Sequence, residues 1–91
     1  NIPKDFVLYQ NHPNPFNPKT VISYQLSVTC FVNLKVSDIQ GKEIITLVNQ
    51  KQGTGIYQVD FTGTGNSSGV YFYQLIIDNK IVDTKKMVLI K

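Results

Sequence analysis

The sequence predicts an all-β fold, a seven-stranded antiparallel β-sandwich. Valine, isoleucine, threonine, tyrosine and phenylalanine are abundant and alanine is absent, a composition typical of strands rather than helices. Short apolar runs recur between turn signals at intervals of roughly eight to twelve residues, and no helical period of useful length appears. The 91 residues of the chain bury about two-thirds of the unfolded surface on folding. We therefore expect one domain, residues 1–91, with a two-layer core.

Each predicted strand is a short run in which apolar residues dominate or alternate with polar ones. The runs are residues 6–10, 20–26, 31–38, 43–48, 55–61, 70–77 and 81–90. In the third run Val32, Leu34 and Val36 fall on one face, which indicates a half-buried strand. The sixth run is apolar apart from Gln74, which predicts a central strand.

The connections between these runs carry turn residues. Residues 38–42 and 78–80 predict tight turns, the second of them a hairpin. Residues 49–54 form a polar bend that contains a glycine. Residues 62–69 hold no large apolar side chain, which predicts a flexible surface loop.

Residues 11–18, the proline loop, contain three closely spaced prolines, Pro13, Pro15 and Pro18. Proline fixes φ and removes a backbone donor, so neither a helix nor a central strand passes through this segment. We interpret it as a rigid, shaped loop in which Phe16 forms an apolar plug. The simpler alternative is a stiff connection between two strands.

Charge and cysteine content exclude several classes of function. The net charge is +3, but all nine basic residues are lysines scattered along the chain. Without arginine there is no bidentate fork for phosphate or guanine, so nucleic-acid binding is not expected. No apolar stretch is long enough to span a membrane, and no signal peptide stands at Asn1. We expect a C-terminal piece of a longer secreted protein, with the targeting signal upstream.

The residues that usually carry chemistry are too few for a catalytic or metal site. His12 is the only histidine, and no nucleophile motif surrounds any serine, so we expect a loop residue near Phe16 and no enzyme activity. One cysteine and one histidine make a poor zinc site, and no calcium-loop spacing occurs. Cys30 fits a small buried hydrophobe, and no disulfide is possible within the chain. No cofactor is expected.

Consecutive aromatic residues, Tyr71, Phe72 and Tyr73, offer an alternative function. An exposed aromatic row binds sugars or partner proteins, whereas a sandwich buries one face of the strand in its core. Core packing is favoured because tryptophan, the usual sugar platform, is absent. A carbohydrate- or protein-binding adhesion module remains one alternative, and a structural domain packed on an upstream catalytic domain is another.

Four motifs in order resemble a known family. Residues 11–18 resemble an opening N-Y-P-N-P-F-N-P loop, with His12 in place of the tyrosine, and residues 32–44 resemble a strand, an aspartate-glycine turn and a second strand. Residues 68–75 resemble an S-G-V-Y-F-Y-x-L strand, and residues 85–91 resemble a K-M-V-L-x-K terminus. Together they are similar to the type A C-terminal sorting domain of bacterial type IX secretion, which also resembles the immunoglobulin-like domain of flagellar hook-cap proteins.

The resemblance implies a non-catalytic signal domain with an immunoglobulin-like fold. It would direct an upstream cargo through the periplasm to the outer-membrane surface or the medium. Its partners would be that cargo, an outer-membrane translocon and a sortase that removes the domain. The residues expected to be recognised are Pro13, Asn14, Pro15, Phe16, Gly69, Tyr71, Lys85, Lys86, Met87, Val88, Leu89 and Lys91.

The proline loop and the C-terminal residues 85–91 suggest a physical basis for such recognition. A rigid proline loop lowers the ordering cost of binding. If the last strand lies at a sheet edge, its backbone groups pair with a receptor strand, while Lys85, Lys86 and Lys91 steer the domain toward an acidic surface. We expect a monomer.

Overall fold

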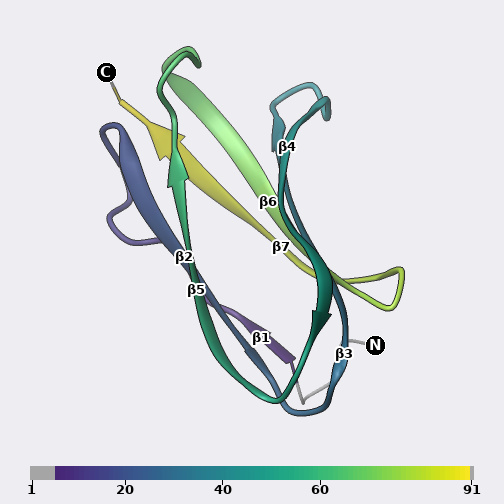
Figure 1. Cartoon of the computed structure of the whole chain (residues 1–91). Helices are drawn as coiled ribbons and strands as arrows, with labels where there is room; N and C mark the ends of the chain where they lie inside the picture. The colour runs from purple at the N-terminus through teal and green to yellow at the C-terminus, as the bar shows by residue number, and fades with distance from the viewer. Residues whose placement is uncertain (1–5, 91) are drawn as a thin grey trace.

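Two antiparallel sheets face each other across one apolar core in the computed structural model, which describes residues 6–90 (Figure 1). The fold is the predicted all-β, immunoglobulin-like sandwich, with no helix in the described part of the chain. The strands are β1 (Phe6–Leu8), β2 (Lys19–Leu26), β3 (Cys30–Asp38), β4 (Glu43–Gln52), β5 (Gly55–Thr62), β6 (Gly69–Ile77) and β7 (Lys80–Leu89).

The strand order separates three central strands, β2, β3 and β6, from four edge strands. One sheet runs β1-β2-β5 and the other β4-β3-β6-β7. In constant-type immunoglobulin domains the fourth strand belongs to the sheet of the first two, whereas here β4 pairs with β3. β6 lies between β3 and β7, which confirms the central strand predicted from its apolar run. β1 packs against β7, so β4 and β5 bound the opposite side of the sandwich.

The core is built from the inward positions of every strand. On β2, β3 and β6 buried and half-buried residues alternate, as the sequence pattern predicted. Fully buried side chains include Ile22 and Tyr24 on β2 and Leu34 on β3. Tyr24 stacks on Tyr57 of β5, with 5.4 Å between ring centroids. Burying this apolar surface is the main favourable term in folding.

β4 differs from its prediction. The polar residues 49–52 were assigned to a bend, but the strand continues through them to Gln52, and only Gly53 and Thr54 form the link to β5. Its outer positions face solvent, so polarity there does not end the strand. The β3–β4 register shifts twice, between Leu34 and Lys35 and between Val36 and Ser37. Such irregularities bend an edge strand away from further pairing.

The predicted tight turns are confirmed. Asp78 and Asn79 join β6 to β7 with positive φ angles of 49° and 68°. Two successive positive φ values match the right-handed twist of a hairpin, and aspartate and asparagine tolerate them. At the β3–β4 turn Gly41 has a φ of 86°, which favours glycine. Nowhere in residues 6–90 does a helix reach the length and apolarity needed to cross a bilayer.

Candidate recognition site

The proline loop is fixed to the core at its start by a buried hydrogen-bond cluster. The side chain of Asn11 donates to the carbonyl oxygen of Pro13 (3.1 Å) and to the hydroxyl of Thr20 (3.0 Å). The backbone amide of Asn11 donates to the hydroxyl of Tyr73 (2.7 Å), and this hydroxyl in turn donates to the Tyr9 carbonyl (2.8 Å). Because the bonds of Asn11 to Tyr73 and to Thr20 are buried, losing a partner there would leave an unsatisfied polar atom. The cluster therefore joins the loop to both sheets.

Phe16 confirms the predicted apolar plug. Its side chain is 1% exposed and contacts Phe61 edge-on, with ring centroids 5.9 Å apart. Its backbone pairs with β7 as well. The Phe16 amide donates to the Val88 carbonyl and the Ile90 amide donates to the Phe16 carbonyl, both at 2.9 Å. The loop is thus more than a stiff connection, because it adds a short parallel bridge to β7.

Two side chains of the loop region extend this contact, which we call the loop–β7 interface. The Gln10 amide group donates to the Lys86 carbonyl (2.7 Å), and the Val88 amide donates to the side-chain oxygen of Asn14 (3.0 Å). β7 is an edge strand, as the receptor-strand hypothesis required. Its outer edge from Lys86 to Ile90 is nevertheless occupied by this chain's own loop. That part of the edge cannot pair with a receptor strand unless the loop leaves.

Gly63 of the β5–β6 loop contacts the last residue of the proline loop. The Gly63 amide donates to the Pro18 carbonyl (2.7 Å). A Cβ atom at Gly63 would lie 2.7 Å from a methyl carbon of Leu89, closer than atoms pack without displacement. Gly63 therefore allows the β5–β6 loop to approach both the proline loop and the end of β7.

Tyr71 lies at the start of β6 and forms a tyrosine corner, a feature that the sequence interpretation missed. Its hydroxyl donates to the Ser67 carbonyl four residues earlier. Tyrosine corners occupy this position at the loop before the sixth strand of immunoglobulin-like domains. The signal was present in the sequence, where Tyr71 stands two residues after Gly69 at the end of a glycine-rich loop.

The residues predicted for recognition divide by burial. Pro13, Asn14, Pro15 and Lys86 are exposed, and Gly69, Lys85 and Val88 are half-buried. The rest of the described set belongs to the core, namely Phe16, Tyr71, Met87 and Leu89. Lys91 lies outside the described residues. In the folded domain the exposed members are the most accessible at the surface.

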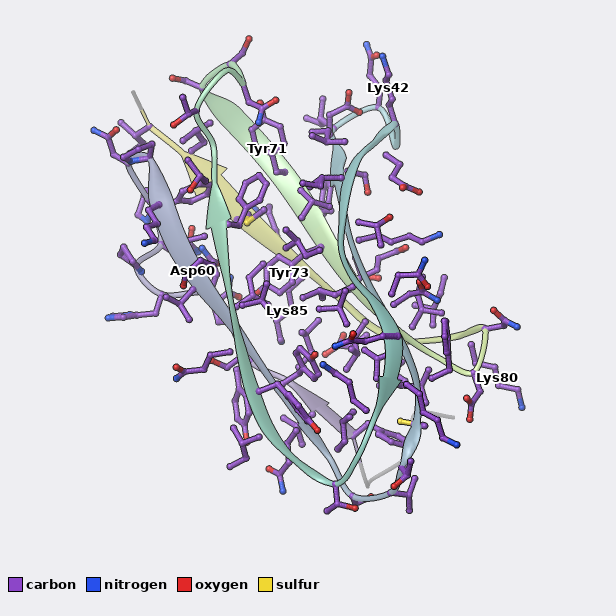
Figure 2. The ribbon with its side chains drawn as sticks, viewed as in Figure 1. Lys42, Asp60, Tyr71, Tyr73, Lys80 and Lys85 are labelled. Carbon is purple, nitrogen blue, oxygen red and sulfur yellow. The ribbon has the colours of Figure 1, made fainter. Side chains whose placement is uncertain are left out.

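The lysines near the C-terminus do not form a single patch. Lys85 is opposite Tyr73 and Lys86 is opposite Phe72, so the two side chains lie on different faces of β7. Lys85 turns toward the inner side, where Figure 2 shows it beside Tyr73, and pairs with Asp83 at 3.7 Å. Only Lys86 of this pair is fully exposed. Lys85 and Lys86 therefore present their charges on opposite faces of β7, and their role in steering stays a prediction.

The aromatic row of β6 is mostly internal. Tyr71 and Tyr73 are buried, and Phe72 alone points to the outer face, half-buried. Burial raises the pKa of Tyr73 to about 12, and the nearby Asp83 carboxylate adds to the rise. A flat strip of exposed aromatics for sugar stacking is therefore not formed by these three residues.

The residues examined for catalysis are placed as ordinary structural residues. The side chain of His12 is exposed, while its backbone pairs with Val21 of β2. Cys30 is buried, and burial raises the pKa of its thiol, with a further contribution from Asp78. A raised pKa is the opposite of an activated thiolate. Within residues 6–90 no group of three or more histidine, cysteine, aspartate or glutamate residues is arranged to hold a metal ion.

A polar hollow of about 400 Å³ opens at the end of the sandwich between the β3–β4 turn and the β5–β6 loop. Lys42 and Tyr71, both labelled in Figure 2, line it together with Asp38 and Glu43. The Asp38 carboxylate already accepts hydrogen bonds from the Gln40 and Lys42 amides, each at 2.9 Å. It thus stabilises the turn.

Comparison with known proteins agrees with the motif set. The family model of the secretion system C-terminal sorting domain matches residues 10–91. The chain belongs to this family of type IX sorting domains. The match begins just before the proline loop and runs through the last strand, so both halves of the loop–β7 interface fall within it. No curated protein matches the sorting domain.

A solved structure of low sequence identity has the same fold as the sorting domain. It is the alkylpurine DNA glycosylase AlkC of Pseudomonas fluorescens bound to DNA containing an abasic site analog, with a TM-score of 0.59. The match covers 96% of this chain but 31% of the glycosylase, at 10% sequence identity. At that identity the likeness concerns the fold alone.

Proposed function

We propose that this sorting domain is the export signal of an upstream cargo protein. The type IX machinery would carry the cargo from the periplasm to the outer-membrane surface or the medium. The observation that carries the proposal is the family match, which spans the loop and the last strand. Members of this family are signals and do not catalyse; the domain is the substrate of a sortase.

The loop–β7 interface supports recognition of the domain in its folded form. Two motifs at opposite ends of the sequence meet there through three hydrogen bonds and a buried phenylalanine, and Gln10 adds a fourth hydrogen bond to Lys86. A receptor that binds Pro13, Asn14, Pro15 and Lys86 would therefore meet a surface whose shape exists before binding. Such preorganisation lowers the entropic cost of association.

The test is an export assay. Residues 1–91 are fused behind a signal peptide and a fluorescent reporter in a host with type IX machinery, and the cells are fractionated. We expect translocon-dependent reporter at the surface or in the medium, and loss of the tail mass where the sortase acts. A reporter that stays in the periplasm with a folded, intact tail would contradict the proposal.

A pair of lysine variants locates the surface. Lys86 at the loop–β7 interface and Lys51 on β4 are both exposed. We expect Lys86→Glu to reduce export and Lys51→Glu to leave it unchanged, since charge reversal acts through the local contact. Equal export by the two variants would remove Lys86 from the recognised surface.

A further inference from the structure

Within residues 6–90, the outer edge of β5 lacks the protection that the other three edges carry. β1 has three residues, β4 has two register shifts, and β7 is covered near its end by the proline loop. β5 has eight residues in unbroken register with β2 and contains neither lysine nor proline. Natural edge strands are normally guarded by short length, bulges, lysine, proline or a covering segment.

The β2 hydrogen bonds identify the backbone groups at this edge. The amide and carbonyl of Val21 both bond His12, on the side of β2 away from β5. In an antiparallel ladder such groups alternate, so Ile22 and Tyr24 face β5 and bond their partners Val59 and Tyr57. The amides and carbonyls of residues 56, 58, 60 and 62 therefore point to the open edge.

The side chains at this edge are also incompletely covered. Tyr57 and Val59 face the core but remain half-buried, because no strand of the same sheet lies beyond them in the described part of the chain. On the outer face Ile56 is 69% exposed. An added strand would pair the free backbone groups and cover apolar surface on both faces.

In place of the monomer expected from the sequence, we propose that β5 pairs with β5 of a second copy of this chain, antiparallel about a two-fold axis at Val59. That register places Gln58 opposite Asp60 twice, Tyr57 opposite Phe61, and Ile56 opposite Thr62. All of the outward amides of residues 56–62 are then paired. The two Asp60 carboxylates are not opposed, and each is held by its own Lys19 at 3.3 Å.

The two-fold arrangement is self-complementary, as an isologous interface requires. It joins two three-stranded sheets into one of six strands. The loop–β7 interface lies on the far side of each sandwich, so it stays free. The inference does not depend on the proposed sorting function, because its test measures association of the purified chain alone.

Sedimentation velocity of the 91-residue chain tests the proposal across micromolar to millimolar concentration. We expect a dimer of twice 10.3 kDa that dissociates on dilution. Gln58→Pro removes an outward amide on each copy without touching the β2 ladder, so it should weaken association roughly tenfold or more. Gln58→Thr, which keeps the amide, is the matched control, and thermal melting confirms that both variants fold.

A cysteine pair tests the register. With Cys30 changed to serine, Val59→Cys should form an intermolecular disulfide on mild oxidation, because the two Val59 positions would be directly opposed. Gln58→Cys, which faces Asp60, should crosslink at least about tenfold more slowly. A monomer at all concentrations, or a dimer unaffected by Gln58→Pro, would overturn the proposal.

Discussion

On one side of the sandwich the proline loop is hydrogen-bonded to β7 and β1 packs against β7, whereas on the other side β4 and β5 end as separate edges. The first side buries Phe16 and Asn11 almost completely. The second leaves Ile44, Leu47, Tyr57 and Val59 partly buried. The same two sheets thus have one sealed flank and one open flank.

The difference shows how a small domain without an internal disulfide fixes one flank by hydrogen bonds and leaves the other flank open. The proline loop, which lies outside the regular strands, seals this flank. It supplies hydrogen-bond partners to the backbone groups of β7 that a further strand would otherwise pair. Fixed geometry is then found where the family motifs meet. The open flank keeps free backbone groups, which suit association with another strand.

The largest expected effect is at the plug of the sealed flank. Phe16→Ala should destabilise the domain by about 3–5 kcal/mol, because it removes a buried ring and leaves a cavity. Phe31→Ala is the control, since Phe31 is 42% exposed, and it should cost less than about 1 kcal/mol. Urea unfolding measures both. Similar losses would mean that the loop does not share the cooperative core.

The next effect concerns Tyr73. Tyr73→Phe should cost about 1–3 kcal/mol, because the Asn11 amide loses its partner in a buried site. Tyr9→Phe is the matched control, since the Tyr9 hydroxyl bonds Gln25 in an exposed setting, and it should be nearly neutral. If the Tyr73 variant is equally neutral by urea unfolding, the hydroxyl does not hold the loop.

The same tyrosine predicts an alkaline dependence of stability. Burial raises its pKa from 10.0 to about 12, so the folded state keeps a proton that the unfolded chain releases. The contribution of Tyr73 to the free energy of unfolding is therefore complete below pH 10 and is lost as pH rises toward 12. Denaturation at several alkaline pH values should show this fall in the wild type and a smaller one in Tyr73→Phe. Parallel curves would assign the fall to other groups.

A glycine pair compares the two flanks directly. Gly63→Ala brings a methyl group against Leu89 at the sealed flank and should cost about 1–3 kcal/mol through overpacking. Gly53→Ala lies in the β4–β5 link, where the nearest atom to a Cβ is 3.9 Å away, and should change stability by less than about 1 kcal/mol. Thermal melts distinguish these outcomes. Equal effects would show that Leu89 moves aside without cost.

Strand identity was predictable because alternation is a local property of the sequence. The prediction from alternation failed at residues 49–52, because this part of an edge strand faces solvent and its polar side chains give no apolar pattern. The loop–β7 interface was not predictable in the same way. Asn14 and Val88 are 74 residues apart, and a single hydrogen bond between distant residues leaves no periodic signal. The family resemblance of residues 11–18 and 85–91 indicated that both segments belong to the family's motif set, but it did not indicate that they are in contact.

The smallest expected effect is at the exposed rim of the sealed flank. Asn14→Ala removes the acceptor of the Val88 amide, which water then replaces, so the cost should be about 0.5–1.5 kcal/mol. Asn17→Ala, an exposed asparagine of the same loop, is the control and should be neutral. Hydrogen exchange is the sharper measurement. The Val88 amide should lose protection in Asn14→Ala, while the Ile90 amide, bonded to the Phe16 carbonyl, should keep it. If both amides lose protection together, the side chain of Asn14 fixes the whole loop. If neither does, the backbone of Phe16 seals the flank alone.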